Sequence, residues 1–203
     1  MITRVLMVST FPLLFGLLAG CGSSPTVYFY TLSAESAAGA GSNMASSQLR
    51  ISVGPISIPE VVDRPQMVVR SGPNQVELVE EHRWAESLNS EVPRVIAENL
   101  SRLLSTDQVW AYPQHVKGAV DYKVSVDIQR FDSMTGQSVA IEALWSIKRV
   151  SQEGDESKVG RSNVQQPVSG QGYEALAEAH SRALAAICGE IADAIRLFPR
   201  PSP

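Results

Sequence analysis

The chain has 203 residues, of which 44% are hydrophobic and 19% are charged, and its formal net charge at pH 7 is −4. These values are ordinary for a globular protein, and they allow one domain with a sizeable core but not two of comfortable size. An acidic chain without basic clusters argues against nucleic acid as a partner and against attachment to anionic lipid by charge.

Residues 1–20 have the organisation of a secretory signal peptide. Arg4 supplies a positive charge, an apolar stretch runs from Val5 to Leu18, and small residues then precede Cys21. This order of charge, apolar core and cleavage site is typical of secretory signals. The alternative is a transmembrane anchor with an incidental cysteine. It is disfavoured because the apolar stretch contains Pro12 and is shorter than the roughly 20 residues that span a bilayer.

The sequence Leu-Ala-Gly-Cys at residues 18–21 resembles the lipobox of bacterial lipoproteins. The resemblance implies that the Cys21 thiol receives a diacylglycerol, that residues 1–20 are removed, and that the new amino terminus receives an N-acyl chain. At about 0.8 kcal/mol for each buried methylene, two or three such chains anchor a protein stably. In lipoproteins an aspartate after the cysteine usually signals retention in the inner membrane, so Gly22 implies the periplasmic leaflet of the outer membrane.

The residues after the anchor predict two short strands separated by a loop. Thr26–Leu32 is aromatic and β-branched, which favours a strand, whereas Ser33–Ser47 is rich in Ala, Gly and Ser and predicts a flexible loop. A second strand is predicted over Leu49–Val53, ending at Gly54-Pro55. The prolines of Ile56–Pro65 indicate an extended, irregular segment rather than a central strand.

A hairpin and a helix follow. Met67–Arg70 and Gln75–Val79 flank Ser-Gly-Pro-Asn, which has the composition of a hairpin turn. The helix is predicted from apolar residues that recur at every fourth position, namely Leu88, Val92, Ile96, Leu100 and Leu104. If Asn89 or Ser90 is its N-cap, Pro93 lies near the first turn, where a missing N–H donor costs little.

Several further strands are predicted in the second half of the chain. Gln108–Tyr112 favours a short strand. The clearest β pattern is the alternation of apolar and polar residues over Tyr122–Ile128 and again over Val139–Ile147, with Gly136 between them. These two runs predict a long antiparallel hairpin with one face in water. Ser157–Val168 favours one more strand.

The last predicted element is an amphipathic helix from Gly172 to the proline at 199, with a broad apolar stripe. The expected fold class is therefore α+β, with an antiparallel or mixed β-sheet packed by two amphipathic helices in a single domain. The expected organisation is a signal peptide (1–20), an acylated segment with the first strand and the flexible loop (21–48), and the main part of the domain (49–203).

The sequence carries no recognisable catalytic or metal-binding motif. None of His82, His115 and His180 is paired with another histidine or a cysteine at metal-ligand spacing. His180 falls in the apolar stripe of the last helix, which predicts a hydrogen-bonded core histidine. Cys188 falls in the same stripe and is predicted to be a small buried core residue. We therefore expect neither an enzyme nor a metal, and no cofactor besides the covalent lipid on Cys21.

Two segments, Val53–Arg70 and His82–Leu104, are distinctive beyond their composition. With the lipobox and the early Tyr28–Leu32, they resemble the PqiC (YmbA) family of ABC-type transport auxiliary lipoproteins, the outer-membrane partners of the paraquat-inducible MCE transport system. The resemblance runs in order over nearly the whole mature chain. Its most specific strings are Asp63-Arg64-Pro65-Gln66 and Arg83-Trp84-Ala85-Glu86.

The resemblance implies a non-catalytic subunit of a lipid transport complex that bridges the inner and outer membranes. The implied partner is an MCE-domain protein, and the implied assembly is a homo-oligomeric ring that docks the far end of that protein's tube. The cargo would be phospholipid or another hydrophobic molecule. Two alternatives remain open, a periplasmic module that itself binds lipid between its helices and sheet, and a structural envelope lipoprotein without a transporter partner.

The residues of the two strings have more than one interpretation. A charge-assisted pair of Asp63 and Arg64 would pin the loop for a partner. We favour a structural role, in which the two side chains satisfy loop backbone and fix the bend. Arg83 and Trp84 would form a cation–π pair or an interface anchor. Alternatively, Trp84 packs on the core face of the first helix.

Overall fold

The computed structural model describes residues 25–35, 48–112, 119–151, 154 and 156–198. The predicted signal peptide, Cys21, Gly22, most of the predicted loop Ser33–Ser47 and His115 lie outside these residues. The described residues form one α+β domain, which confirms the predicted fold class.

The domain contains eight strands and two helices. In chain order they are β1 (Tyr28–Tyr30), β2 (Ile51–Ser57), β3 (Gln66–Gly72), β4 (Gln75–Trp84), α1 (Leu88–Leu104), β5 (Val109–Ala111), β6 (Tyr122–Met134), β7 (Ser138–Arg149), β8 (Glu156–Pro167) and α2 (Gly172–Arg196). The predicted hairpin, the short strand before residue 112, the long hairpin, the strand after it and both helices are confirmed.

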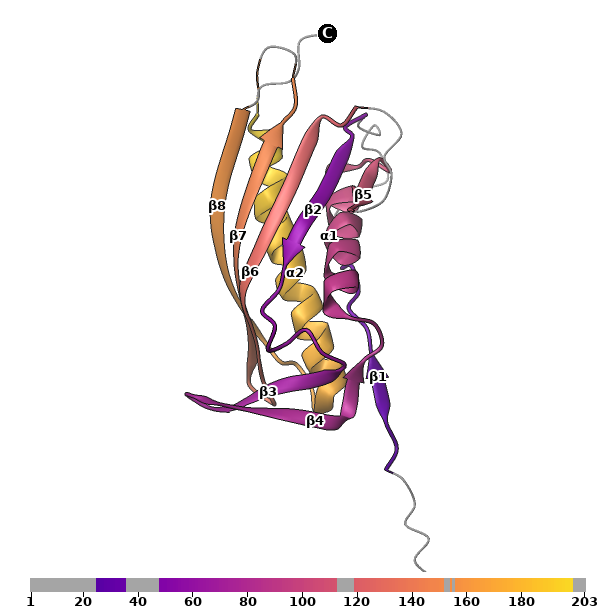
Figure 1. Cartoon of the computed structure of the whole chain (residues 1–203), viewed down its shortest axis with the longest axis vertical. Helices are drawn as coiled ribbons and strands as arrows, with labels where there is room; N and C mark the ends of the chain where they lie inside the picture. Colours follow the sequence, from indigo (N-terminus) through magenta and orange to yellow (C-terminus); the bar gives the residue numbers. More distant parts are fainter. Residues whose placement is uncertain (1–24, 36–47, 113–118, 152–153, 155, 199–203) are drawn as a thin grey trace, which may run out of the picture.

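The strands form two sheets rather than one. The large sheet has the order β5-β2-β6-β7-β8, in which β2 is parallel to β5 and β6 while β6, β7 and β8 are antiparallel neighbours. The small sheet has the order β1-β4-β3, with β1 parallel to β4. The small sheet lies at the end of the molecule where both helices begin, opposite the C-terminal end of α2 (Figure 1).

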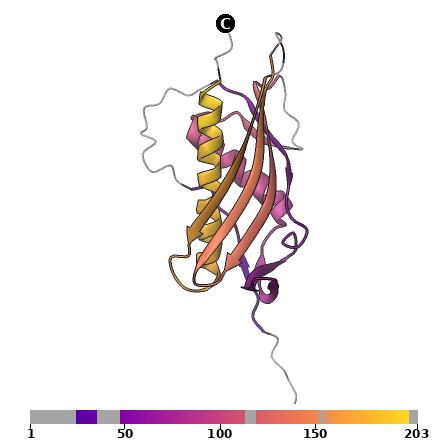
Figure 2. The same ribbon diagram turned by 90° about the vertical axis from the view of Figure 1, so that its left-hand side faces the viewer.

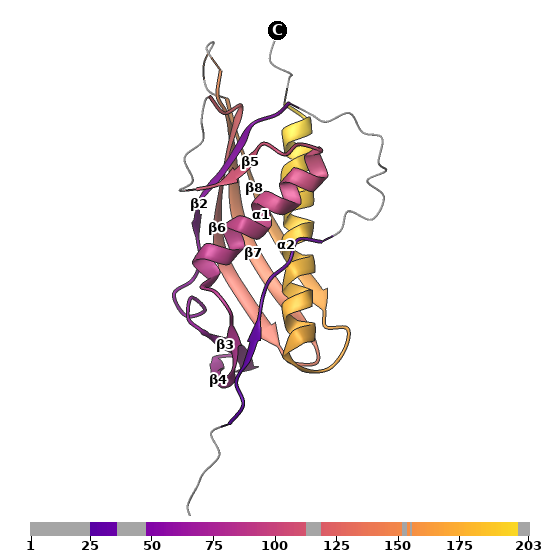
Figure 3. The same ribbon diagram turned by 90° about the vertical axis from the view of Figure 1, so that its right-hand side faces the viewer.

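Both helices cover the same face of the large sheet. Figure 2 shows the sheet in front of the helices, and Figure 3, from the opposite side, shows the helices in front of the sheet. The helix α2 packs on β7 and β8, and α1 packs on α2, β5 and β2. Neither described helix has both the length and the apolar character needed to traverse a bilayer. The core between these layers is aliphatic, and its wholly buried members include Ile51, Leu88, Ile96, Leu100, Ile141, Ile147, Leu176, Leu184, Ile187 and Ile191.

The prediction that the second strand ends at Gly54-Pro55 is wrong. Strand β2 continues to Ser57, and Ile56 and Ser57 pair with Val126 and Asp127 of β6. The pairing register shifts between Val53 and Ile56, so a bulge absorbs the extra residue and the missing N–H of the proline. Gly54 has a φ of +130°, and a Cβ there would lie 2.6 Å from the Cβ of Tyr112. Glycine is therefore the residue that lets the strand pass this point.

The start of α1 also differs from the prediction. The N-cap is Ser87, whose side chain caps no backbone N–H, so neither Asn89 nor Ser90 has that role. Instead, Oδ1 of Asp63, in the loop between β2 and β3, accepts the backbone N–H of Asn89 at 3.4 Å. Because the helix begins at Leu88, Pro93 lies in its second turn rather than its first. A tertiary contact thus supplies the cap that local sequence was expected to supply.

Gly160 on β8 lies directly opposite Trp145 on β7, and a Cβ at residue 160 would overlap the indole ring. We expect Gly160→Ala to lower the free energy of unfolding in urea by about 2 kcal/mol, because the ring has to move. The control is Gly189→Ala in α2, where a Cβ meets nothing within 4 Å. That change should raise stability by up to about 1 kcal/mol. Equal urea midpoints for Gly160→Ala and the parent chain would contradict this packing.

Candidate functional site

The two strings singled out in the sequence meet in space. Gln66 is paired with Arg83 across β3 and β4, and the N–H of Trp84 donates to the carbonyl of Pro65 at 2.7 Å. The side chains of Gln66 and Arg83 both donate to the carboxylate of Glu80, at 3.0 and 3.2 Å respectively. The loop before β3 is therefore joined by hydrogen bonds to the end of β4, just before α1 begins.

Asp63 and Arg64 act on different partners. Asp63 accepts hydrogen bonds from both the backbone and the side-chain amide of Asn89, which holds the loop against the start of α1. Arg64 donates its backbone N–H to the carbonyl of Val62 at 2.9 Å, and its Nε is buried without a hydrogen-bond partner among the described residues. No ion pair joins Asp63 to Arg64 in the part of the chain that the structure describes.

Trp84 lies in the core, with 5% of its surface exposed. Its ring meets Phe131 and His180 edge-on, with centroids 6.4 and 6.1 Å away. Arg83 points elsewhere and pairs with Glu80. The position of Trp84 beneath α2 is that of a packing residue rather than a surface anchor.

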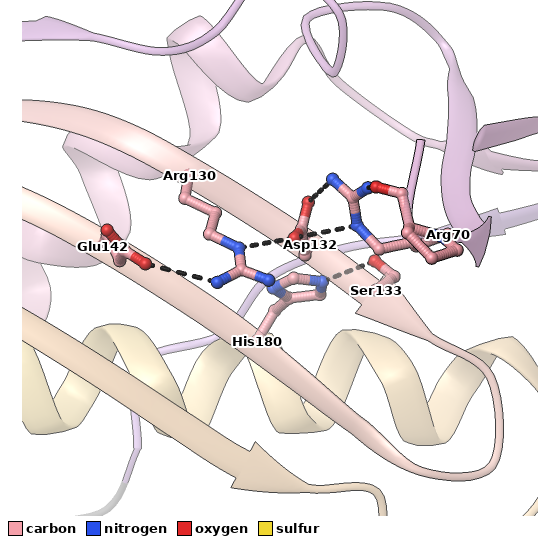
Figure 4. Close-up of polar contacts among 7 residues, drawn as sticks. Arg70, Arg130, Asp132, Ser133, Glu142 and His180 are labelled. Carbon is pink, nitrogen blue, oxygen red and sulfur yellow. Dashed lines mark hydrogen bonds and ion pairs between the residues drawn. The ribbon is translucent and has the colours of Figure 1, made fainter. Parts of the chain in front are cut away.

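A cluster of charged side chains links the small sheet to the large one (Figure 4). Arg70 of β3 donates to both carboxylate oxygens of Asp132 on β6, at 3.0 and 2.9 Å. Arg130 donates to Asp132 at 2.5 Å and to Glu142 of β7 at 3.2 Å. Burial raises the pKa of Asp132, but the hydrogen bonds from the two arginines outweigh it, so the pKa lies below its ordinary value. The bidentate contact fixes the tilt of the β3–β4 hairpin on the large sheet.

His180 of α2 lies directly beneath this cluster and is fully buried. Its Nε2 is hydrogen-bonded to Oγ of Ser133 at 2.8 Å, and its ring stacks on Phe131 with centroids 4.0 Å apart. Burial lowers the pKa of His180 to about 3, so the ring is neutral. The prediction of a hydrogen-bonded core histidine is confirmed. The prediction of a buried Cys188 is also confirmed, and burial raises the pKa of its thiol, which makes it unreactive.

Asp132→Asn should destabilise the protein, because two arginines lose the charge that compensates them at a site where the carboxylate is only 12% exposed. We expect the free energy of unfolding to fall by about 2 kcal/mol. The control is Asp193→Asn, which removes a carboxylate that is 73% exposed and paired with Arg196. Surface pairs contribute little, so that change should be nearly neutral. Equal losses in urea titrations of the two variants would show that the cluster does not hold the hairpin.

The chain between β1 and residue 35 is pinned across the two helices by side chains that the sequence analysis did not single out. The N–H of Leu32 donates to Glu91 at 2.9 Å, that of Ser33 to Ser181 at 3.1 Å, and that of Glu35 to Asn99 at 3.1 Å. Arg102 donates to the carbonyls of Ala34 and Glu35. The available signal was weaker: Glu91 and Asn99 are polar residues eight positions apart on one side of α1, with the apolar Val95 between them.

Aromatic side chains gather where β1 meets β4 and the start of α2. His82 stacks on Tyr173 with ring centroids 3.8 Å apart and on Tyr28 at 5.3 Å, and its Nδ1 is hydrogen-bonded to the Tyr30 hydroxyl at 2.7 Å. These rings line a hollow of about 860 Å³, which we call the aromatic hollow. Its other lining residues are Phe29, Thr31, Ser33, Gln171, Gly172, Glu174, Ala177, Glu178 and Ser181.

A second, more apolar hollow of about 790 Å³ lies on the face of the large sheet away from the helices. Its side chains come from positions such as Asp127, Leu144, Ser146 and Val159, which alternate with the buried positions of β6, β7 and β8. We call it the outer-face hollow. The space between helices and sheet, by contrast, is occupied by the aliphatic core.

The described residues contain no group of three or more His, Cys, Asp or Glu side chains that could hold a metal ion. Instead, hydrogen bonds hold the loop before β3 against the start of α1, and aromatic side chains form an exposed surface beside β1. Its chemistry suits binding to another surface.

The chain is similar to known proteins in sequence and in fold. The sequence model of a family described as "ABC-type transport auxiliary lipoprotein component" matches residues 30–192. A crystal structure described only as an uncharacterized protein superposes with a TM-score of 0.63 at 16% identity, covering 84% of this chain and 99% of the other. Protein XCC0632 from Xanthomonas campestris, of the family DUF330, superposes with a TM-score of 0.56 at 20% identity, covering 83% and 93%. At these identities the likeness shows the fold alone. No curated protein matches the sequence.

Proposed function

Because the chain belongs to the family of ABC-type transport auxiliary lipoprotein components, we propose that it is the outer-membrane lipoprotein of an MCE-type lipid transport complex that bridges the two membranes. Its role is non-catalytic: it docks the end of an MCE-domain protein and helps to assemble the conduit. The observation that carries the proposal is the family match over residues 30–192, which includes both distinctive strings.

The position of the tether supports this role. The described chain begins at Pro25, three residues before β1, and β1 lies at the small-sheet end of the molecule (Figure 1). Cys21 precedes it by four residues, which span at most about 14 Å when extended. Acyl chains on Cys21 would therefore hold the small-sheet end next to the bilayer and leave the opposite end free to project into the periplasm. The backbone N–H groups of Leu32, Ser33 and Glu35 donate hydrogen bonds to side chains of α1 and α2, so this segment fixes the orientation of both helices relative to the anchor.

A ring of identical subunits is the assembly we propose. One compact subunit cannot encircle the end of a tube, whereas several copies around one axis form a closed ring. Mass photometry of the detergent-extracted protein should give one closed oligomer. A monomer at all concentrations would contradict the ring.

The proposed partnership is tested by crosslinking in cells. A photoreactive amino acid at exposed positions such as Tyr112 should capture an MCE-domain protein, identified by mass spectrometry. The control places the same residue at the buried Ile96, where no partner should be captured. Absence of any MCE-domain protein from every exposed position would favour the structural envelope lipoprotein.

A second candidate, a module that itself binds lipid, is favoured by one observation, the outer-face hollow of about 790 Å³. This hollow lies on the opposite side of the sheet from the cleft expected from the sequence. Native mass spectrometry after mild detergent extraction separates the two roles. Lipid bound at one molecule per chain, and lost in Val159→Glu, would favour the binding module over the docking subunit.

A further inference from the structure

The exposed apolar side chains are concentrated at one end of the molecule. Ten large apolar side chains are exposed among the described residues, and six of them lie in β1, directly before β1, in β4 or in the loop that leads into β3. The six are Val27, Tyr28, Phe29, Val61, Val76 and Leu78. Phe29 is the most exposed of these, at 65%, and Tyr28 follows at 53%. Exposed apolar surface gathered in one region marks a contact with something other than water.

The predicted lipid anchor on Cys21 determines which surface faces the small-sheet end. Phe29 follows Cys21 by eight residues, so even a fully extended linker keeps it within about 28 Å of the acylated residue. Strand β1 is held to β4 by parallel pairing and, beyond it, to α1 and α2 by the bonds of Leu32 and Ser33. The short linker therefore brings the whole small-sheet end to the bilayer, and not β1 alone. Phe and Tyr side chains are favourable at a membrane–water interface.

The charges at this end select the kind of lipid surface. The lining of the aromatic hollow contains two exposed carboxylates, Glu174 and Glu178, and no lysine or arginine. Among the described residues neither carboxylate takes part in an ion pair. Such a surface repels anionic headgroups. An ammonium group, by contrast, is attracted both by carboxylates and by the faces of tyrosine rings such as Tyr28 and Tyr173.

We propose that the small-sheet end is a membrane-contact surface, in which Tyr28 and Phe29 enter the bilayer interface and the aromatic hollow accepts the ammonium headgroups of zwitterionic lipids. The body of the protein then lies on the leaflet that carries its anchor, rather than swinging from a loose tether. This inference rests on the proposed lipid anchor, and it adds a second, non-covalent attachment. Two attachments fix the axis of the domain relative to the membrane normal, which a docking subunit requires.

The contact is tested on the acylated protein in vesicles of phosphatidylcholine and phosphatidylethanolamine. Acylation blocks Cys21 and Cys188 is buried, so a cysteine introduced at a chosen position is the one that accepts a nitroxide label. The positions are Phe29→Cys and Leu78→Cys at the small-sheet end, with Leu197→Cys, 74% exposed at the other end, as control. Collision of the label with oxygen, which concentrates in the bilayer, is compared with collision with a water-soluble nickel chelate.

The proposal requires the oxygen-to-nickel collision ratio to rise severalfold at residues 29 and 78 when the protein is moved from detergent to vesicles, and to stay unchanged at residue 197. If the labels at 29 and 78 remain as accessible to nickel as the label at 197, the contact surface does not exist. Protection of these two labels only after a partner protein is added would equally overturn the membrane contact. Circular dichroism of each labelled protein confirms that the fold is intact.

The preference for ammonium headgroups is tested in a separate experiment. In vesicles of phosphatidylglycerol the collision ratio at residue 29 should be lower than in the zwitterionic vesicles. Glu174→Gln with Glu178→Gln should abolish the difference, whereas Asp193→Asn at the far end of the same helix should keep it. Equal ratios on both lipids in the parent chain would overturn the ammonium preference. A protein without acyl chains, detected by its intact mass before reconstitution, would instead refute the lipid anchor and with it the proposed function.

Discussion

Replacing Cys21 with serine should leave the protein as an unprocessed precursor without covalent lipid. The serine hydroxyl is a far weaker nucleophile than a thiol and does not take the place of the lipobox cysteine, so the diacylglycerol is not added and residues 1–20 stay attached. Intact mass spectrometry should show a chain heavier by the signal peptide and lighter by the acyl groups. Incorporation of labelled palmitate should fall to background. The loss of membrane anchoring should be large, because each acyl chain contributes about 0.8 kcal/mol for every buried methylene.

The control for this change is Cys188→Ser. Cys188 is buried beside the backbone of Ile96, where it acts as a small core residue, so the variant should be acylated and processed normally although it is less stable. A Cys21→Ser protein that still carries an acyl group would contradict the predicted anchor. A processed and acylated Cys188→Ser protein is the expected companion result.

Sorting to the outer membrane is a separate claim with its own variant. Gly22→Asp should be acylated as the parent chain is, but should move from the outer-membrane to the inner-membrane fraction in a density gradient. Gly22→Ser, which adds a polar side chain without charge, is the matched control and should stay with the outer membrane. If Gly22→Asp has the same distribution between the membranes as the parent chain, a signal other than residue 22 sorts the protein.

Local patterns predicted the elements well where a strand or helix has one wet and one dry face. The alternation over Tyr122–Ile128 and Val139–Ile147 became β6 and β7, and the four-residue spacing from Leu88 to Leu104 became α1. In each case burial on one face dictates the period. The same logic placed His180 and Cys188 in the core, because both fall on the apolar stripe of α2.

The errors arise where partners distant in sequence decide the outcome. Strand β2 passes Pro55 because β6 pairs with it both before and after the proline and a bulge absorbs the proline, which no local composition shows. The division into two sheets arises because β4 pairs with β3 and β1 and with no strand of the large sheet. At the start of helix α1, the N–H of Asn89 donates to the carboxylate of Asp63, which lies in the loop between β2 and β3, 26 residues earlier in the chain.

The charged cluster was missed although it has a weak local signal. Arg130 and Asp132 are two residues apart on one strand, so their side chains share a face. Nothing in the sequence shows that Arg70 of the small sheet reaches the same carboxylate. The two strings were recognised as distinctive, but their meeting through Gln66 and Arg83 follows from the tertiary fold.

The stability of the domain should fall as the pH is lowered from about 6.5, and His180 should be a principal cause. Burial lowers its pKa to about 3 in the folded protein, whereas an unfolded histidine has a pKa of about 6.5. Between these values the unfolded chain binds a proton that the folded chain does not, so acid favours unfolding. The loss reaches about 1.4 kcal/mol for each pH unit between roughly pH 6 and pH 4.

The matched variant is His180→Gln, which keeps a polar group near Ser133 but does not titrate. Urea unfolding of both proteins at a series of pH values should give a steeper slope for the parent chain over this range. Below about pH 4 Asp132 adds to the loss in both proteins, because its lowered pKa means that its stabilising charge disappears as the pH falls through the folded value. Parallel slopes between pH 6 and 4 would mean that His180 accepts a proton without unfolding. Water would then have to reach the His180 ring where it stacks on Phe131. In that case the core beneath the charged cluster would not be closed to water.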